Sequence, residues 1–326
     1  EDGTVMSIEE YCTRYGLDYS TVKSYRLMNH LTPARYSVVF HSKEEEETEE
    51  EKESIKDHLQ EVFESITVKS RTKKKGKKIG VVNLADLHLG AYIDGLRSSP
   101  TYSIQILIDR LHQIADIVNG HNFKEVHVHI LGDLVESFSG LNHKNVWKGL
   151  AKGMHGAELI KFTTKVLHEH FLALINNLCK VKIIGGNHDR FSHDNSIDNE
   201  GGVADVISWS LGLIGYDIEF DSMVLNNVVD GVSYVLLHGD KGISKRKAKE
   251  IIFDYGKQGL YNVILEAHLH SLIVKEDSHN SVRMHVRSLF TGNAYSEELG
   301  FTSTAGFTLF VNEGTGIPNM FNYNLK

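Results

Sequence analysis

The chain has 326 residues, of which 41% are hydrophobic and 24% charged, so it can form one large α/β domain or two modest ones and has the composition of a soluble globular protein. It contains no apolar run as long as a membrane span, no opening signal-peptide pattern and only two distant cysteines, so we expect a cytoplasmic protein without a membrane partner. The formal net charge of −8 argues only weakly against nucleic acid, because eight glutamates between 44 and 53 account for all of it.

Residues 1–40 are expected to form a small all-α unit. Ser7 begins a capping box, which predicts a short helix, a break at Gly16 and a second helix. The pattern resembles a helix-turn-helix motif, whose second helix faces the major groove or the phosphates of DNA. The candidate DNA-binding residues are Tyr19, Lys23 and Arg26. A protein-contact domain with the same core spacing is the alternative.

Residues 41–78 are expected to be a charged linker that contains one amphipathic helix. Five apolar side chains share one helical face over 54–66, and that face must pack on the main domain or on a second copy, which would give a homodimer. The basic run 68–78 follows and is either a phosphate-binding segment or a solvated linker.

From residue 79 to 326 the pattern predicts one α/β domain. Buried strands are expected at 79–85, 125–131, 181–185, 233–238 and 261–266. Helices are expected at about 101–118, 143–176, 200–212 and 244–256. The segment 272–325 has short β-prone runs that we expect to be antiparallel strands completing a second sheet.

Polar side chains follow each of the five predicted strands. They are Asp86 and His88, then Asp133, then Asn187 and His188, then His238, then His268 and His270. Functional sites of such sheets form where the strands end, so we expect these residues to meet. Carboxylate, amide and imidazole ligands without cysteine indicate two divalent ions, with Mn²⁺ favoured and Fe or Zn²⁺ as alternatives, and do not indicate a structural zinc site.

This ordered set of motifs resembles that of the calcineurin-like metallophosphoesterases. The family pattern is D-x-H, G-D, G-N-H-D/E, H and G-H-x-H, and here it covers roughly residues 79–275. The resemblance implies an α/β fold in which two sheets form a sandwich flanked by helices. It also implies a binuclear metal site that cleaves phosphoesters by in-line attack of a metal-bridging hydroxide.

The resemblance also implies a role for each residue of the set. Asp86, His88 and His270 would hold the first metal, and Asn187, His238 and His268 the second. Asp133 would bridge the two metals, and His188 would be the catalytic acid that faces the phosphate. Ala267 stands where the family usually has glycine, and it would cost roughly 1 kcal/mol if that position needed a positive φ.

Other polar residues near the motifs have less specific interpretations. We interpret His127 and His129, in mid-strand, as structural. Asp189 matches the motif but is also suited to capping the next turn. For Asp240, a role in supporting the metal ligands and the absence of such a role are equally favoured. We assign His193, Asp194 and Asp198 to a solvated loop.

The substrate is not determined by the fold. The N-terminal motif, the basic run 68–78 and the lysine-rich stretch 241–250 after His238 together favour DNA, although each of the two basic stretches is also compatible with a solvated surface. We therefore predict a nuclease similar to the exonuclease subunit of double-strand-break repair complexes. The alternatives are a phosphatase or cyclic-nucleotide phosphodiesterase, and a DNA-binding regulatory module that retains the fold.

Overall fold

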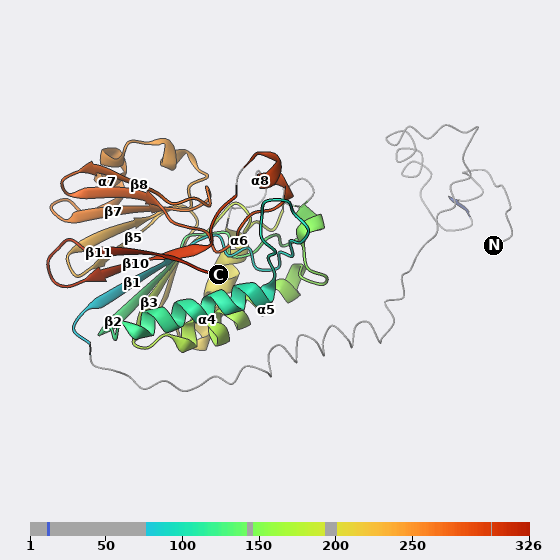
Figure 1. The fold of residues 1–326 in the computed structure, drawn as a ribbon, viewed down its shortest axis with the longest axis horizontal. Coiled ribbons are helices and arrows are strands. Elements are labelled where there is room, and N and C mark those ends of the chain that lie inside the picture. The colour runs from blue at the N-terminus through green and yellow to red at the C-terminus, as the bar shows by residue number, and fades with distance from the viewer. Residues whose placement is uncertain (1–11, 14–75, 142–145, 193–200, 301) are drawn as a thin grey trace. The chain divides into compact units, whose positions relative to one another are not determined.

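The computed structural model in Figure 1 describes residues 12–13, 76–141, 146–192, 201–300 and 302–326. Contacts divide the chain into two units, Glu1–Ser65 and Ile66–Lys326, and nearly all described residues belong to the second. Apart from Cys12 and Thr13, the predicted all-α unit lies outside the described residues, as does the helix over 54–66. The domain boundaries at 40 and 78 stay predictions.

The first sheet of the second unit has six strands. In spatial order they are β11 (Asn319–Asn324), β10 (Gly306–Asn312), β1 (Ile79–Leu84), β2 (Glu125–Ile130), β3 (Leu178–Ile184) and β4 (Ile218–Asp221). The strands β1 to β4 run parallel, whereas β10 pairs antiparallel with β1 and β11 antiparallel with β10. The run IGVVNL of β1, which is buried after its first residue, is that of a strand covered on both faces.

The second sheet has five strands. In spatial order they are β5 (Leu225–Val229), β6 (Val232–Leu236), β7 (Tyr261–Glu266), β9 (Ser281–His285) and β8 (Ile273–Ser278). The central strand β7 pairs parallel with both of its neighbours, and the outer strands pair antiparallel. The carboxyl ends of β6 and β7 therefore lie at one edge of this sheet.

The main hydrophobic core lies between the two sheets. Val81 and Phe310 of the first sheet pack with Tyr234, Val263 and Met284 of the second, and all five are buried. Burial of such a side chain contributes about 1.5–3 kcal/mol. The predicted two-sheet α/β sandwich is confirmed.

Helices cover the outer faces of the sandwich (Figure 1). Figure 1 shows α4 (Ile104–Gly120), α5 (Gly156–His170) and α6 (Gly202–Ile214) beside the first sheet, whereas α7 (Ala248–Tyr255) packs on the second. Short elements occur in the connections: η1 (Val146–Gly149), η2 (Leu172–Leu174), η3 (Gly242–Lys245) and α8 (Ala294–Glu298). None of the helices in the described part of the chain is long and apolar enough to cross a membrane.

Two sequence predictions about this unit are wrong. The helix predicted over 143–176 begins only at Gly156, because Gly153 and Gly156 adopt positive φ angles of 77° and 61° that interrupt a right-handed helix. The predicted second-sheet segment 272–325 is divided between the sheets. Its strands β8 and β9 extend the second sheet, whereas β10 and β11 extend the first, where the free side of β1 accepts β10.

Candidate metal centre

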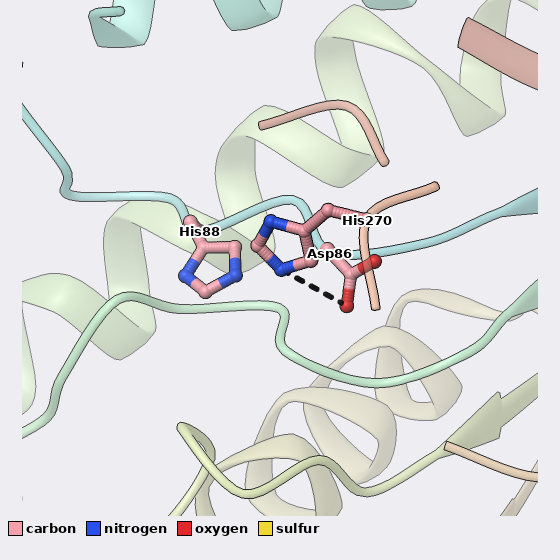
Figure 2. A group of neighbouring side chains, drawn as sticks. All are labelled: Asp86, His88 and His270. Carbon is pink, nitrogen blue, oxygen red and sulfur yellow. Dashed lines mark ion pairs between the residues drawn. The ribbon is translucent and has the colours of Figure 1, made fainter. Parts of the chain in front are cut away.

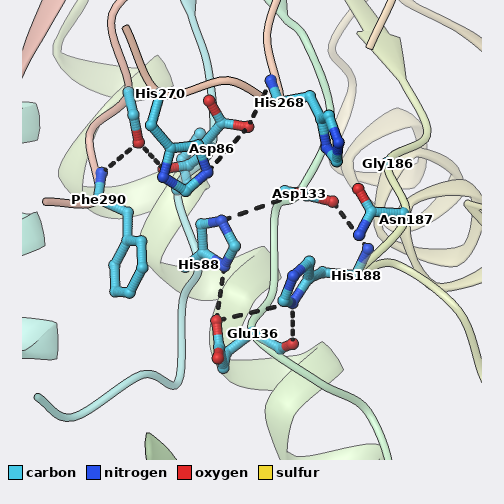
Figure 3. A network of polar contacts seen from close by, with 12 residues as sticks. Asp86, His88, Asp133, Glu136, Gly186, Asn187, His188, His268, His270 and Phe290 are labelled. Carbon is cyan, nitrogen blue, oxygen red and sulfur yellow. Dashed lines mark hydrogen bonds and ion pairs between the residues drawn. The ribbon is translucent and has the colours of Figure 1, made fainter. Parts of the chain in front are cut away.

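The loops that leave five strands meet at one edge of the sandwich. They carry Asp86 and His88 after β1, Asp133 after β2, Asn187 and His188 after β3, His238 after β6, and His268 and His270 after β7. Figure 3 shows most of these side chains in one network of polar contacts. The structure thus brings together all seven predicted metal ligands and the predicted catalytic histidine.

Three overlapping groups of side chains are arranged as metal ligands. They are Asp86 with His88 and His270, His88 with Asp133 and His188, and Asp133 with His238 and His268. Within each group the ligand atoms lie within 4.8 Å of one another. Figure 2 shows the first group, in which Nε2 of His270 lies 3.8 Å from Oδ1 of Asp86. Because His88 and Asp133 each belong to two groups, the arrangement suits two neighbouring ions.

Asp133 lies at the centre of the site. Its Oδ2 atom is 3.2 Å from Nε2 of His238 and 3.7 Å from Nε2 of His88, which belong to opposite ends of the cluster. The backbone N–H of His188 donates to its Oδ1 atom at 2.8 Å and fixes the carboxylate. Asn187 reaches the same end as His238, with its Oδ1 atom 3.0 Å from Nε2 of that ring. This is the geometry of a carboxylate shared between two sites.

The residues present fit a pair of divalent ions. Asp86, His88, Asp133 and His238 are almost fully buried, yet Asp86 Oδ2 and His88 Nε2 have no hydrogen-bond partner among the described residues. An unsatisfied buried polar atom costs about 1–3 kcal/mol, so each of these two needs a further partner. Oxygen and imidazole nitrogen are the ligands of Mn²⁺, Fe and Zn²⁺.

The backbone of the site is strained. Asp86, His88, Asp133, His268 and His270 all have φ between 45° and 66°, in the left-handed region that non-glycine residues rarely adopt. Each such residue costs on the order of 1–3 kcal/mol, and strain of this kind concentrates at functional sites. The strained residues are five of the seven predicted ligands.

Two motif glycines allow the loops to approach closely. A Cβ atom on Gly132 would lie 2.6 Å from Nδ1 of His238, and one on Gly186 would lie 2.2 Å from Oδ1 of Asp133. Gly132 also has a φ of 90°. The glycines of the G-D and G-N-H-D motifs are therefore needed because the loops after β2, β3 and β6 contact each other at these points.

Backbone hydrogen bonds hold the first loop in place. The N–H of His88 donates to the carbonyl of Asp133 at 2.9 Å, so the loops after β1 and β2 run side by side beyond the sheet. The carbonyl of Asp86 accepts from the N–H of Phe290 at 3.0 Å and from the Ser288 hydroxyl at 3.2 Å. The loop after β1 is thus fixed from both sides.

Burial and neighbouring charges shift the pKa values of the site in opposite directions. Burial raises the pKa of Asp86 to about 7. Burial also acts to raise the pKa of Asp133, but the charges of His238 and His188 outweigh it and hold that pKa well below its ordinary value. Burial, together with His238, lowers the pKa of His268 to about 4. Asp133 is therefore ionised and His268 neutral near pH 7, the forms in which these two side chains bind a metal ion.

Two residues that the sequence analysis did not select also belong to the site. Glu136 accepts a hydrogen bond from Nδ1 of His88 at 2.6 Å, and its carbonyl accepts from Nδ1 of His188 at 2.7 Å (Figure 3). The ring of Phe290 lies 4.4 Å from that of His88 between centroids. The sequence offered one signal for Glu136, which is its carboxylate three residues after Asp133 of the G-D motif. Phe290 had none, because it comes from a distant loop.

Asp189 and Asp240 support the site without belonging to any of the three groups. Asp189 is fully buried and accepts from the N–H of Val135 at 3.1 Å and of Gly186 at 3.0 Å, so it joins two of the loops. Burial acts to lower the pKa of His238, but Asp133, and more weakly Asp86 and Asp240, raise it to about 10.

The mid-strand histidines lie apart from the site. His129 is buried between the sheets, with its ring nitrogens 2.8 Å from the side chains of Asn83 and Asn227. The ring of His127 is near Glu125 and Cys179, and this group shares no residue with the metal centre. The buried, hydrogen-bonded ring of His129 agrees with a structural interpretation, and that of His127 stays a prediction. The predicted DNA-binding residues Tyr19, Lys23 and Arg26 lie outside the described residues, as do His193, Asp194 and Asp198.

Ala267 does not occupy a strained position. It is fully buried in the main core and is not among the residues with positive φ, whereas His268 and His270 are. Alanine therefore does not have the cost of about 1 kcal/mol that was expected if residue 267 needed a positive φ. The strain that the sequence analysis considered for Ala267 occurs at the two histidines that follow it.

Comparisons with known proteins identify the family. The calcineurin-like phosphoesterase family matches residues 79–301. Similar solved structures include the phosphoesterase Yfce from E. coli (9% identity, 76% of this chain and 100% of that one, TM-score 0.37). A dimetal phosphatase from Danio rerio is also similar (11% identity, 76% of this chain and 99% of that one, TM-score 0.41). So is a Vps29 single mutant from Entamoeba histolytica (13% identity, 76% of this chain and 99% of that one, TM-score 0.36). No curated protein matches the sequence. The chain therefore belongs to the calcineurin-like phosphoesterase family and is a metal-dependent phosphoester hydrolase.

Proposed function

We propose that this hydrolase is a nuclease that cleaves phosphodiester bonds of DNA with two divalent ions, Mn²⁺ being favoured. The observation that carries the proposal is a set of exposed aromatic rings on the loops that also carry the metal ligands. Such rings suit the stacking of nucleobases, which contributes about 1–3 kcal/mol per base, and a small phosphomonoester makes no use of them.

The aromatic rings belong to three of the five loops. Tyr92 follows His88 closely and is 51% exposed, and Phe191 follows His188 and is 37% exposed. Trp147, 60% exposed, lies in the loop after Asp133. The segment of Trp147 runs beside that of Tyr92, since the N–H of Tyr92 donates to the carbonyl of Gly149 at 2.6 Å. Side chains exposed in this way are available to a substrate that extends beyond the metal centre.

Positive charge on the segment that follows His238 also supports a polyanionic substrate. The loop and helix that follow His238 expose Lys245, Lys247 and Lys249. Lysines at the surface contact backbone phosphates without reading sequence, and binding releases counterions from the DNA. We therefore expect the affinity for DNA to fall as the salt concentration rises.

Two of the three groups, Asp86 with His88 and His270 and Asp133 with His238 and His268, support the ligand assignment that the family resemblance implies. Asp86, His88 and His270 would hold one ion, Asn187, His238 and His268 the other, and Asp133 both. When bound, two such ions activate water and neutralise the charge of the phosphoryl oxygens. The chain itself orients these ligands through the strained loops and the hydrogen bonds described above.

His188 has the geometry of the residue that protonates the leaving oxygen. Because the Glu136 carbonyl accepts from Nδ1, that nitrogen carries a proton and the ring orientation is fixed. Nε2 is then the nitrogen that exchanges a proton with the substrate. The His188 side chain is 16% exposed, in contrast to 2% for His88, so a substrate can reach it from the solvent. General acid catalysis of this kind contributes about 10²–10⁴-fold.

A panel of substrates tests the proposal. The Mn²⁺-loaded protein should cleave single- or double-stranded DNA, and replacing Trp147 by alanine should raise the KM for DNA more than that for a p-nitrophenyl phosphoester. If the loaded protein leaves both forms of DNA intact and hydrolyses the small phosphoester well, the chain is a phosphatase or small-molecule phosphodiesterase. A protein that binds DNA and metal but hydrolyses none of these substrates would be a regulatory module.

The N-terminal unit and the oligomeric state complete the proposal. If residues 1–40 bind DNA, their deletion should weaken the affinity of the chain for DNA and flatten its salt dependence. An unchanged affinity would favour a protein-contact domain. A homodimer through the helix at 54–66 would be detected by sedimentation and abolished by charged substitutions on its apolar face. Both cysteines are free, which agrees with the proposed cytoplasmic location.

A further inference from the structure

An open cavity of about 250 Å³ adjoins the metal centre. It shares His270 with that centre, and its remaining polar lining consists of Ser271, Arg287, Thr302, Ser303 and Thr304. Arg287 is the one lining residue with a permanent charge, and no carboxylate is among the lining residues. A cavity with one guanidinium and several hydroxyl groups has the chemistry of an anion site.

The side chain of Arg287 is held by close packing. Arg287 follows β9, and its stem passes over Gly306 at the start of β10. A Cβ atom on Gly306 would lie 2.5 Å from Cδ of Arg287 and 3.3 Å from its Cβ, so only glycine leaves room for the stem. The N–H of Gly306 donates to the carbonyl of Ser288 at 3.1 Å, which ties the two segments together.

The guanidinium of Arg287 is incompletely satisfied. Its Nε atom is buried and has no hydrogen-bond partner among the described residues. A buried donor of a charged group that lacks an acceptor is costly, and the cost is removed when an acceptor arrives. Nε and one terminal nitrogen of arginine form the pair of parallel donors that matches two oxygens of a phosphate.

The segment of Arg287 is joined directly to the metal centre. The next residue, Ser288, donates its hydroxyl to the carbonyl of Asp86 at 3.2 Å, and Phe290 donates its N–H to the same carbonyl. The ring of Phe290 packs against His88 and His270, with centroids 4.4 and 5.8 Å apart (Figure 3). An anion bound by Arg287 is therefore placed at a fixed position relative to the metal ligands.

We propose that Arg287, with the hydroxyls of Ser271, Thr302 and Thr304, binds the phosphate group that neighbours the scissile phosphodiester of a polynucleotide. The inference rests on the proposed nuclease function and specifies its substrate, since a lone phosphomonoester has no second phosphate to offer. Arg287 is thus a positioning residue that selects substrates with consecutive phosphates. Contacts to phosphates fix the register of a nucleic acid and are independent of its sequence.

Three dinucleotides that contain the same scissile bond test the inference. They are TpT, its 5′-phosphorylated form pTpT and its 3′-phosphorylated form TpTp. With the full chain and Mn²⁺, we expect one phosphorylated form to have a KM about tenfold lower than TpT, because its second phosphate gains a charge-assisted hydrogen bond. The Arg287→Gln variant should remove this difference in KM, and Arg287→Lys should restore part of it.

A matched control and a second readout separate specific from general effects. Lys275→Gln removes one positive charge from the exposed strand β8, which contributes no residue to the cavity, and should keep the tenfold difference. Equilibrium binding of the same dinucleotides in EDTA, where no hydrolysis occurs, should show the same preference in the wild type and its loss in Arg287→Gln.

Two outcomes would overturn the inference in distinguishable ways. If the wild type cleaves all three dinucleotides with equal KM, or if Arg287→Gln keeps the preference, then Arg287 does not bind a neighbouring phosphate although the nuclease function stands. If instead the enzyme leaves every internucleotide bond intact and only removes the terminal phosphates, then the nuclease function is itself wrong.

Discussion

Oε2 of Glu136 lies 2.6 Å from Nδ1 of His88, and both side chains are almost fully buried. Burial acts to lower the pKa of His88, but this hydrogen bond and the charge of Glu136 outweigh it and raise the pKa to about 9. The contact fixes the orientation of the His88 ring, and Nε2 then faces Asp133. A carboxylate behind a metal-binding histidine orients the ligand and increases its basicity.

Replacing Glu136 by glutamine should therefore weaken metal binding. The amide keeps the shape of the side chain but loses the charge, and loss of such a partner costs about 10–100-fold in metal affinity. Calorimetric titration with Mn²⁺ measures the change. Glu158→Gln, the same substitution at an exposed position of α5, serves as the control. An unchanged Kd for Mn²⁺ in Glu136→Gln would show that Glu136 does not support the metal site.

Replacing His188 by alanine should impair catalysis and spare metal binding. We expect kcat to fall by about 10²–10⁴-fold, because the leaving oxygen loses its acid, while the Kd for Mn²⁺ changes little. His279→Ala, at the exposed turn between β8 and β9, is the matched control. Full activity in His188→Ala with metal bound would mean that the assigned mechanism is wrong. A large loss of metal affinity would make His188 a ligand.

Replacing Ala267 by glycine should destabilise the protein. Glycine is the residue usual in the family, but Ala267 needs no positive φ here and its methyl group lies in the main core. Glycine also increases the entropy of the unfolded chain, so we expect the free energy of unfolding to fall by about 1 kcal/mol. Chemical denaturation measures it. A more stable Ala267→Gly variant would show that the loop is strained at this residue after all.

The buried His129 should make stability depend on pH. Burial, and next the charge of His127, hold the pKa of His129 well below its ordinary value of 6.5. The unfolded chain therefore binds a proton that the folded chain rejects, and stability is lost as the pH falls below about 6.5. His129→Gln should reduce the slope of unfolding free energy against pH by up to about 1.4 kcal/mol per unit. Identical slopes in both proteins would contradict this account.

Much of this site was predictable because the family motifs stand at strand ends. The strands β1 and β7 are largely buried runs that are followed by the polar ligand residues, and parallel strands bring such ends to one edge. Glu136 and Arg287 were not selected. Neither belongs to a motif, and each gains its role from a contact between segments that are distant in the sequence.

The two errors in the fold have different physical origins. The helix predicted over 143–176 ignored glycines that the sequence does contain, so a local signal was available. The sheet to which β10 belongs had no such local signal, because a short β-prone run can pair with a strand of either sheet. Only the contact of β10 with β1, in which Ile79 pairs with Asn312 from the opposite end of the domain, assigns β10 to the first sheet.

The position of β10 has a consequence for how the protein is made. The strand β1, which leads to Asp86 and His88, lies between β2 and β10, and β10 follows every segment that carries a predicted metal ligand. Until Gly306–Asn312 has been synthesised, one side of β1 remains an open edge. We therefore expect the metal centre to reach its final geometry only after β10 has paired with β1, although all of its predicted ligands are synthesised earlier.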